Sequence, residues 1–553
     1  METLREQVAR RHDALVQERS SWMAHWQEIS ENLMPRSGRF LSGKENQGDK
    51  RHNKIYDNTG IIAARTLSAG LQAGMTSPAR PWFRLTTSDP RLDEADAVKR
   101  WLSEVSRLMQ MIFGASNTYR ALHTMYGELG GFGTAASVLL PNFKRVIHHY
   151  PLTIGQYCLA LDAEGNVNTL SREFEPTVGQ MVEEFGLARC SMTVRNLHDR
   201  NALDKRVKVI HVIEPRKARD ASKRDNLNMP WRSVYFEAGG DDDKILRESG
   251  FKEFPVLAPR WTTEAGDVYG YSPGMEALGD IKSLQHEQLR KAQGIDYKTR
   301  PPLQLPTSMS GQSLNMLPGG ATYVDAPGQQ PAVRSLFEVN LDLSHLLEDI
   351  RDVRERIRSS FYADLFLMMA NDTRSGITAT EVAERHEEKL LMLGPVLERQ
   401  HNELLQPKIE LTFTRMVEAG LVPPAPPELQ GRELNVEFVS MLAQAQRAVA
   451  TNGIDRFVGN LGVIAQYKPD VLDKLDSDRW ADTYADMLGV DPELIVPSQQ
   501  VVMIRKQRAE AQQAAAAAEQ MQQAADTASK LGGINTAQPN VLTDATRAFS
   551  GYS

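Results

Sequence analysis

The residue types that most often bind metals occur in this chain as short runs without the partners that such sites need. The HEE run at 386–388 lacks the second histidine of an HExxH zinc motif, so we interpret it as a helix surface. The histidine pair at 148–149 has no third ligand nearby and is typical of strand residues. The aspartates at 241–243 follow two glycines, which favours a polar turn over a cation site.

Nucleophile and phosphate motifs give no clear signal in the sequence. The GxSxG spacing occurs at 270–274, where we interpret Ser272 as a helix N-cap, and there is no GxxxxGK[ST] loop that would indicate nucleotide binding. A glycine cluster lacks GxGxxG spacing, and we interpret it as a loop between a helix and a strand: Gly127, Gly130, Gly131 and Gly133. A catalytic triad assembled from distant segments stays open. We therefore predict no catalytic residue, no metal and no cofactor.

The cysteine count and the composition restrict the class of protein further. Cys158 and Cys190 are too few for a disulfide scaffold or a CxxC zinc site, so we expect two reduced thiols. Of the 553 residues 41% are hydrophobic and 24% charged, which indicates a folded chain with several units. The net charge of -7 argues against a globally basic nucleic-acid binder. No stretch reaches the ~20 apolar residues of a membrane span, and the N-terminus lacks a signal-peptide core.

Periodicity predicts helices in the N-terminal part and a mixed region after it. Apolar residues at helical spacing predict an amphipathic helix over 3–34, and Asp57 or Asn58 is a candidate cap for the next helix. Further helices are expected over 57–75, 93–113 and 176–188, and strands over 137–140, 207–213 and 233–236. A loop packed under the core is expected over 78–84, and a hairpin turn near 162–165. The segment 130–270 therefore has mixed α+β character.

Two amphipathic helices that flank a proline- and glycine-rich insert are the most informative feature. Ser272 as N-cap and Pro273 in the first turn predict a helix that ends before Pro301. A second helix is expected from Asp342, with many opposite charges three or four residues apart. The insert at 301–341 is small for an independent core, so a partner or neighbouring copies are expected to stabilise it. An ordinary helical hairpin remains the alternative.

The remaining sequence predicts a loop, a long irregular helix and a helical C-terminus. The loop covers 363–377, and either Thr378 or Thr380 is expected to cap a helix to about residue 419; Thr378 with Glu381 fits a capping box. Pro395 and Pro407 should kink or divide that helix. We expect a strand over 434–439, helices from 440 on, and an Ala- and Gln-rich helix over about 498–530 with a mobile tail. The expected fold class is mixed α+β and predominantly helical.

Considered together, several stretches resemble the portal proteins, or head-to-tail connectors, of short-tailed bacteriophages. No single stretch is a catalytic fingerprint, and the specificity lies in their combined order along most of the chain. The stretches are MPRSGRF at 34–40, YDNTGIIAARTLSAGLQAGMTSPARPWFRL at 56–85, GFGTAA at 131–136, YGYSPGMEALGDIKSLQ at 269–285, TRPPL at 299–303, ATEVAER at 379–385 and FVSMLAQAQRA at 438–448.

This resemblance implies a ring of twelve copies at one capsid vertex, with a channel for double-stranded DNA during packaging and ejection. It also implies a portal-like architecture with a two-helix stem and a small α/β clip. The parts would be a wing at 1–270 and 378–440, a stem at 271–300 and 342–362, a clip at 301–341, a tunnel loop at 363–377 and a helical crown with a mobile tail at 441–553.

The resemblance further implies the partners and the place of action. The partners would be the terminase large subunit, a tail adaptor, the major capsid and scaffolding proteins, and DNA in the channel, with no membrane involved. The protein would assemble in the host cytoplasm and remain in the virion at the portal vertex. An acidic assembly suits a channel that lets DNA slide instead of binding it tightly.

Two sets of residues are candidate functional sites under this resemblance, and a solvated surface is the alternative for both. The tunnel-loop set is Met368, Met369, Asn371, Thr373 and Arg374, where the methionines are equally compatible with ordinary core packing. The set for subunit contacts in the stem is Asp349, Arg351, Asp352, Glu355 and Arg358. A tail adaptor or ejection protein of a phage virion is the alternative function, and a metal-dependent nuclease is a more distant one. Adaptors generally lack a helix–insert–helix stem, which favours the portal.

Overall fold

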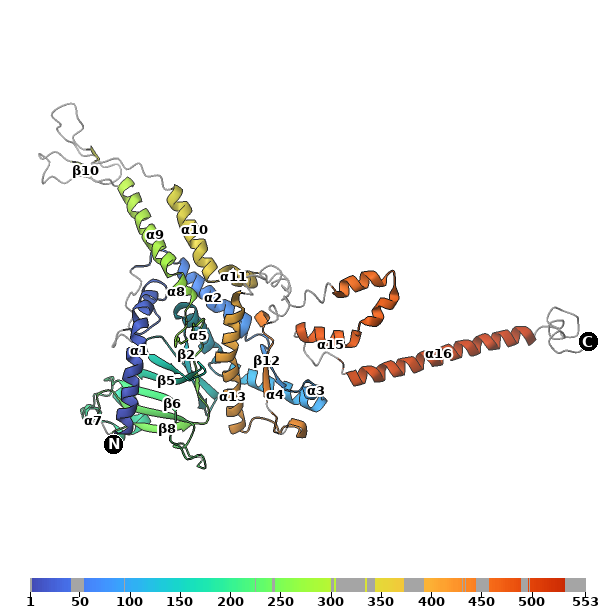
Figure 1. Cartoon of the computed structure of the whole chain (residues 1–553), viewed down its shortest axis with the longest axis horizontal. Helices are drawn as coiled ribbons and strands as arrows, with labels where there is room; N and C mark the ends of the chain where they lie inside the picture. Colours follow the sequence, from blue (N-terminus) through green and yellow to red (C-terminus); the bar gives the residue numbers. More distant parts are fainter. Residues whose placement is uncertain are drawn as a thin grey trace, which may run out of the picture. The chain divides into compact units, whose positions relative to one another are not determined.

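The structure, a computed structural model, describes most of the chain (Figure 1). The described residues are 2–40, 54–93, 95–223, 225–240, 244–299, 303–304, 334–335, 344–371, 392–429, 431–432, 434–443, 457–488, 496 and 498–532. The chain divides into two compact units, Met1–Asn452 and Gly453–Ser553. The predicted hairpin turn at 241–243, the HEE run at 386–388 and the capping box at Thr378 lie outside the described residues.

Helix α1 (Leu4–Asn32) begins at the capping box formed by Thr3 and Glu6, which satisfies the first free amides of the helix. Its apolar stripe packs along the five-stranded sheet, where Val8 joins one buried cluster and Leu15 another. Farther along, Trp26 is fully buried in the main core. The amphipathic helix expected over 3–34 is confirmed.

Two antiparallel sheets form the mixed region. The three-stranded sheet has the order β3-β2-β9, and the five-stranded sheet has the order β4-β5-β6-β7-β8. The strands are β2 (Ala136–Asn142), β3 (Val146–Leu152), β4 (Tyr157–Leu161), β5 (Val167–Phe174), β6 (Val209–Pro215), β7 (Trp231–Glu237), β8 (Arg247–Phe251) and β9 (Val256–Leu257). Between β5 and β6 lie α6 (Val178–Phe185), a short 3-10 turn and α7 (Met192–Asp199). The mixed α+β character of this region is confirmed.

The glycine cluster does not form the expected loop. Gly127, Gly130 and Gly131 lie inside helix α5 (Thr118–Phe132), and only Gly133 follows it, as a left-handed cap with a φ of 77°. The reason is close packing: a Cβ on Gly130 would lie 2.7 Å from Leu67 of helix α2 (Thr59–Met75). A Cβ on Gly131 would lie 2.0 Å from the Met34 sulfur. The glycines therefore let neighbouring segments approach the α5 backbone.

A small sheet joins distant parts of the first unit. Strand β1 (Phe83–Thr87) pairs antiparallel with β12 (Leu434–Phe438), and Phe83 faces Phe438 in the register. The side chains of Trp82 and Phe83 are buried, as expected for a segment tucked under the core, although the segment continues into a strand. Helices α3 (Pro90–Asp93) and α4 (Asp96–Ala115) follow β1.

The helix–insert–helix prediction is confirmed for its two helices. Short helix α8 (Pro273–Glu276) leads into α9 (Leu278–Thr299), and α10 (Ser344–Ser360) returns beside it (Figure 1). At the far end, β10 (Leu303–Gln304) pairs with β11 (Arg334–Ser335).

The loop expected over 363–377 is wrong for its first residues, because Ala363–Asn371 forms helix α11. The apolar run explains the difference. Leu365 and Phe366 are buried in the core, and α11 packs against α2, where a Cβ on Gly70 would lie 2.1 Å from the Phe366 ring. A helix buries these two side chains while satisfying its own backbone.

The long helix before β12 is irregular at its second proline. Residues 392–400 are helical, one π turn covers His401–Leu405, and α13 (Gln406–Glu418) carries Pro407 in its first turn. A proline lacks the N–H that a regular helix needs, which accounts for an irregular turn just before it. The turn carries Glu403, whose carboxylate binds the buried Arg260 guanidinium at 2.7 Å.

The second unit is helical where it is described. Residues 457–465 are helical, and a 3-10 turn at Pro469–Lys474, helix α15 (Ser477–Leu488) and helix α16 (Ser498–Gly532) follow. Arg505 of α16 binds both carboxylate oxygens of Asp478 at 2.6 Å. The expected C-terminal helix over about 498–530 is confirmed.

Candidate functional site

The base of the paired helices is fixed to the glycine-rich end of α5. The Ser272 hydroxyl accepts a hydrogen bond from the Met275 amide at 3.1 Å and donates one to the Gly131 carbonyl at 2.8 Å. A Cβ on Gly274 would lie 2.8 Å from that same carbonyl oxygen. The predicted N-cap is therefore confirmed, and it also sets where α8 and α9 leave the body.

A buried carboxylate joins both long helices to the segment before α2. Asp57 accepts hydrogen bonds from the Thr59 amide at 2.9 Å and from the Thr59 hydroxyl at 2.6 Å. Its other oxygen binds the Arg354 guanidinium of α10 at 2.7 Å and the Gln288 amide of α9 at 3.0 Å. Burial alone would raise the pKa of Asp57, but the hydrogen bonds from Thr59 and Arg354 outweigh it and lower that pKa.

Gln285 of α9 completes this junction from the other side. Its side-chain oxygen accepts from the Tyr56 amide at 2.6 Å and the Asp57 amide at 2.8 Å, and its nitrogen donates to the Asp57 carbonyl at 2.9 Å. Sequence reasoning missed Asp57, Gln285 and Arg354 as a group. One signal was available in the sequence. Asp57 lies in YDNTG at 56–60 and Gln285 in SLQ at 283–285, and both runs belong to the stretches that carry the family resemblance.

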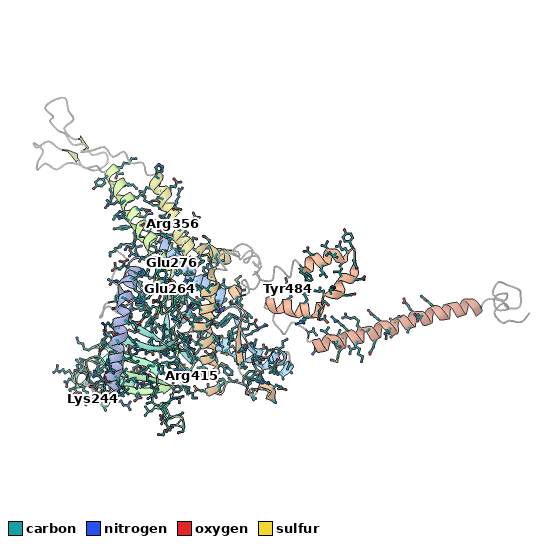
Figure 2. All side chains as sticks on the ribbon, in the orientation of Figure 1. Lys244, Glu264, Glu276, Arg356, Arg415 and Tyr484 are labelled. Carbon is teal, nitrogen blue, oxygen red and sulfur yellow. The ribbon has the colours of Figure 1, made fainter. Side chains whose placement is uncertain are left out.

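One side of the paired helices carries carboxylates that share a single guanidinium. Arg356, labelled in Figure 2, binds Asp280 of α9 at 3.2 Å and also pairs with Asp352 one turn away. Burial raises the pKa of Glu287, and the nearby charge of Asp349 raises it further. We call this side the acidic flank, defined by Asp280, Glu287, Asp349 and Asp352.

The opposite side of α10 carries arginines beside an open groove of about 560 Å³. Arg354 and Arg358 line this groove together with residues of α2 and α11, and Arg351 lies one turn away on the same side of the helix. Leu347 shares that side and is 42% exposed. We call this side the basic flank, defined by Arg351, Arg354 and Arg358.

The five predicted contact residues of the stem do not form one patch. All five are exposed on α10. Helical spacing assigns Asp349 and Asp352 to the acidic flank, Arg351 and Arg358 to the basic flank, and Glu355 to the outward face between them. Their function in subunit contacts stays a prediction.

The tunnel-loop candidates fall at the end of the described segment. Met368, Met369 and Asn371 belong to helix α11. Thr373 and Arg374 lie outside the described residues. Their function in the channel therefore also stays a prediction.

The strongest pKa shifts of the first unit occur in its closed core. The Lys408 ammonium lies 3.9 Å from the centre of the Phe113 ring and 4.9 Å from that of Trp82, and burial lowers the pKa of Lys408 well below its usual range. His149 lies on strand β3, as expected, and burial together with the nearby Lys408 charge lowers its pKa to about 3. Both side chains are buried, so they offer no open site for a substrate.

Among the described residues, no group of three or more His, Cys, Asp or Glu side chains could hold a metal ion. Within the same part of the chain, no helix combines the length and the apolar character that a membrane crossing requires. The features that the structure brings together are junctions between helices and charged flanks. Such features are compatible with a structural protein.

A protein family and two sequence relatives agree with this class. Residues 5–496 match the family of bacteriophage head to tail connecting proteins. The chain is 65% identical over 552 residues to a probable portal protein of Bordetella phage BPP-1, with 100% of both chains covered. It is 45% identical over 543 residues to the portal protein of Salmonella phage epsilon15, with 98% of each covered. A chain from the virion of a native gene transfer agent particle overlaps 78% of this chain and 90% of its own length, at 10% identity and a TM-score of 0.33.

The chain belongs to the family of bacteriophage head-to-tail connecting proteins. The predicted resemblance to phage portal proteins is thereby confirmed, and with it the function as a portal that forms the DNA channel at a capsid vertex. The family is structural and not enzymatic, and the protein is a virion component.

Proposed function

We propose that twelve copies of this chain close into a ring, with the paired helices α8–α9 and α10 as the stem. The observation that carries this proposal is the geometry of those helices. They leave the body side by side from a base fixed by Ser272 and Asp57, and most of the charged side chains of α10 remain exposed in one chain. Exposed charges on both sides of a rigid helix pair suit contacts with neighbouring copies.

The other parts of the ring follow in the same order along the chain. Residues 1–270 and 378–440 form the wing, 301–341 the clip, 363–377 the tunnel segment and 441–553 the crown. In the tunnel segment, Arg374 supplies a basic band that is repeated around the ring, with Asn371 and Thr373 as weaker phosphate contacts. The net charge of -7 per copy disfavours tight binding, so the DNA can slide.

The clip is the proposed docking surface for the terminase large subunit during packaging and for the tail adaptor afterwards. The chain itself has no nucleotide-binding motif, so the energy for DNA movement is assigned to a separate ATPase. The ring is proposed to assemble in the host cytoplasm among the major capsid and scaffolding proteins.

The oligomeric state of the purified full-length chain tests the ring. Mass photometry and negative-stain images are expected to give annular particles with close to twelve subunits and a central opening wide enough for a DNA duplex. Persistent monomers, or particles without a continuous opening, would contradict the proposal. Those outcomes would favour the alternative of a tail adaptor or ejection protein.

Substitution of Arg374 tests the tunnel segment separately. Arg374→Ala is expected to lower the DNA packaged or retained per particle by at least about twofold, because one basic band disappears from every copy. Ring assembly should stay intact. The matched control is Arg80→Ala, which removes the same charge from an exposed position between α2 and β1. Loss of assembly in the Arg374 variant would instead assign the segment to a subunit contact.

A further inference from the structure

The two flanks of α10 lie on opposite sides of its buried stripe. Ile350, Val353 and Ile357 face the body and are buried. At 100° per residue, positions 347, 351, 354 and 358 fall on one side of that stripe and positions 349, 352 and 356 on the other. This single helix of 17 residues therefore carries most of its positive charges on one side and its two aspartates on the other.

Among the described residues, the acidic flank has more carboxylates than cations. One guanidinium, that of Arg356, reaches two of its four carboxylates, Asp280 and Asp352. Within the described part of the chain, the Oε2 atom of Glu287 is buried and has no hydrogen-bond donor, and burial, together with the charge of the neighbouring Asp349, raises the pKa of Glu287. A buried carboxylate oxygen without a donor costs free energy, and a second carboxylate beside it increases that cost. A positively charged donor from outside this flank would lower both costs.

The basic flank has such donors to offer. Arg354 is engaged by Asp57. Within the described part of the chain, Arg351 and Arg358 are exposed and have no carboxylate partner. The groove beside them is bordered by apolar side chains, since Ile62 is 52% exposed and Leu367 43% exposed. An exposed apolar rim with unpaired guanidinium groups is typical of a protein interface.

We propose that the basic flank of each copy docks on the acidic flank of the next copy, so that Arg351 and Arg358 of one chain reach Asp349 and Glu287 of its neighbour. The occupant is a second copy of this chain because the two flanks complement each other in charge on one and the same helix. A two-fold symmetric pairing through either flank would bring like charges together. A head-to-tail contact joins opposite charges, and repeated head-to-tail contacts close into a ring. This inference rests on the proposed ring. It specifies which flank of α10 in one copy contacts which flank in the next.

Charge reversal on each flank gives a two-sided test. Asp349→Lys with Asp352→Lys makes both flanks positive, and Arg351→Glu with Arg358→Glu makes both negative. Each variant alone is expected to form rings at least about tenfold less often than the unaltered chain at equal concentration, since like charges then meet at every contact. An equimolar mixture is expected to restore rings, because alternating copies join opposite charges at every contact. Native mass spectrometry should find equal numbers of the two variants in each ring.

Glu348→Lys is the matched control, since it reverses one charge on the outward face of the same helix and should leave ring formation unchanged. Thermal unfolding of each variant as a monomer, compared with the unaltered chain, verifies that the body is folded. Rings from either double variant alone, or folded variants whose mixture stays dissociated, would overturn the docking of these flanks while the ring itself stands. Absence of rings in the unaltered chain would overturn the proposed ring first.

Discussion

Helices α1 and α16 are both long and both follow from the sequence, yet the chain uses them differently. Helix α1 has 29 residues and buries seven of them, including Trp26 and Ile29. Helix α16 has 35 residues, and its described side chains from 502 to 520 are all exposed. For example, the apolar side chain of Met503 is 61% exposed.

This difference in burial indicates two sources of stability. Contacts within one chain stabilise α1, whereas α16, where its side chains are described, makes few such contacts and would gain stability from neighbouring copies. The apolar stripe of α1 packs against its own sheet, so its helical form is stabilised by tertiary contacts. Helix α16 has alanines and glutamines where a packed helix has large apolar residues, and five alanines follow one another at 514–518. Such a helix suits close contact with neighbouring copies, a role that remains part of the proposed crown.

The largest expected effect is on α1. Trp26→Ala should destabilise the first unit by about 3–5 kcal/mol, because it removes a fully buried indole and leaves a cavity. The indole also stacks on Trp22, with 5.8 Å between the ring centroids, and it packs edge-on against the Tyr269 ring, with 4.9 Å between the centroids. Denaturant unfolding of the dissociated protein measures the change.

Two controls make the comparison between the helices quantitative. Gln27→Ala, at the neighbouring exposed position of α1, should change stability by no more than about 0.5 kcal/mol. Met503→Ala, which truncates a large apolar side chain on α16, should stay within the same limit in the dissociated chain. A loss of several kcal/mol from Met503→Ala would show that α16 is packed within one chain.

The sequence predicted elements whose residue pattern is local, and it missed those decided by contacts across the fold. Periodicity and capping residues were sufficient for α1, α9, α10 and α16. The glycines of α5 were assigned to a loop because glycine usually interrupts helices, and only the approach of Leu67 and Met34 explains them.

The candidate site shows the same limit. That α10 carries charges was visible from its sequence, but their separation into two flanks also depends on which residues α9 brings beside them, such as Asp280 and Glu287. The junction of Asp57 with Arg354 joins residues far apart in the chain. No local pattern encodes such a pair, because each partner alone is compatible with an ordinary exposed charge.

A smaller effect is expected from the hydrogen-bonded contact that ties α1 to its sheet. Glu173 of β5 binds the His12 ring at 3.0 Å and also pairs with Lys208. Burial alone would raise the pKa of Glu173, but the hydrogen bonds from His12 and Lys208 outweigh it and lower that pKa to about 2. Because the folded pKa lies below the ordinary value of 4.5, this contact contributes stability above that pH and loses it as the pH falls towards 2.

Glu173→Gln should therefore lower the melting temperature at neutral pH and reduce the part of the acid-induced loss that falls between about pH 4.5 and 2. Melting curves across that range measure both quantities. Glu183→Gln, on the exposed face of α6, is the control and should leave the profile unchanged. An identical acid profile in the Glu173 variant would show that another group controls the contact between α1 and the sheet.

The smallest effect on the stability of one chain, and the most informative one for the comparison, is expected from deletion of 498–553. The first unit is compact without this segment, so its melting temperature should stay within error of the full-length chain. Rings should still form, since the paired helices that carry the proposed contacts are intact. Because the exposed faces of α16 are then missing from every copy, the number of subunits per ring or the retention of DNA should become less uniform, as mass photometry and DNA protection from nuclease would measure. If the truncated chain fails to fold, α16 belongs with α1 among the elements that stabilise one chain, and the contrast between the two helices is wrong.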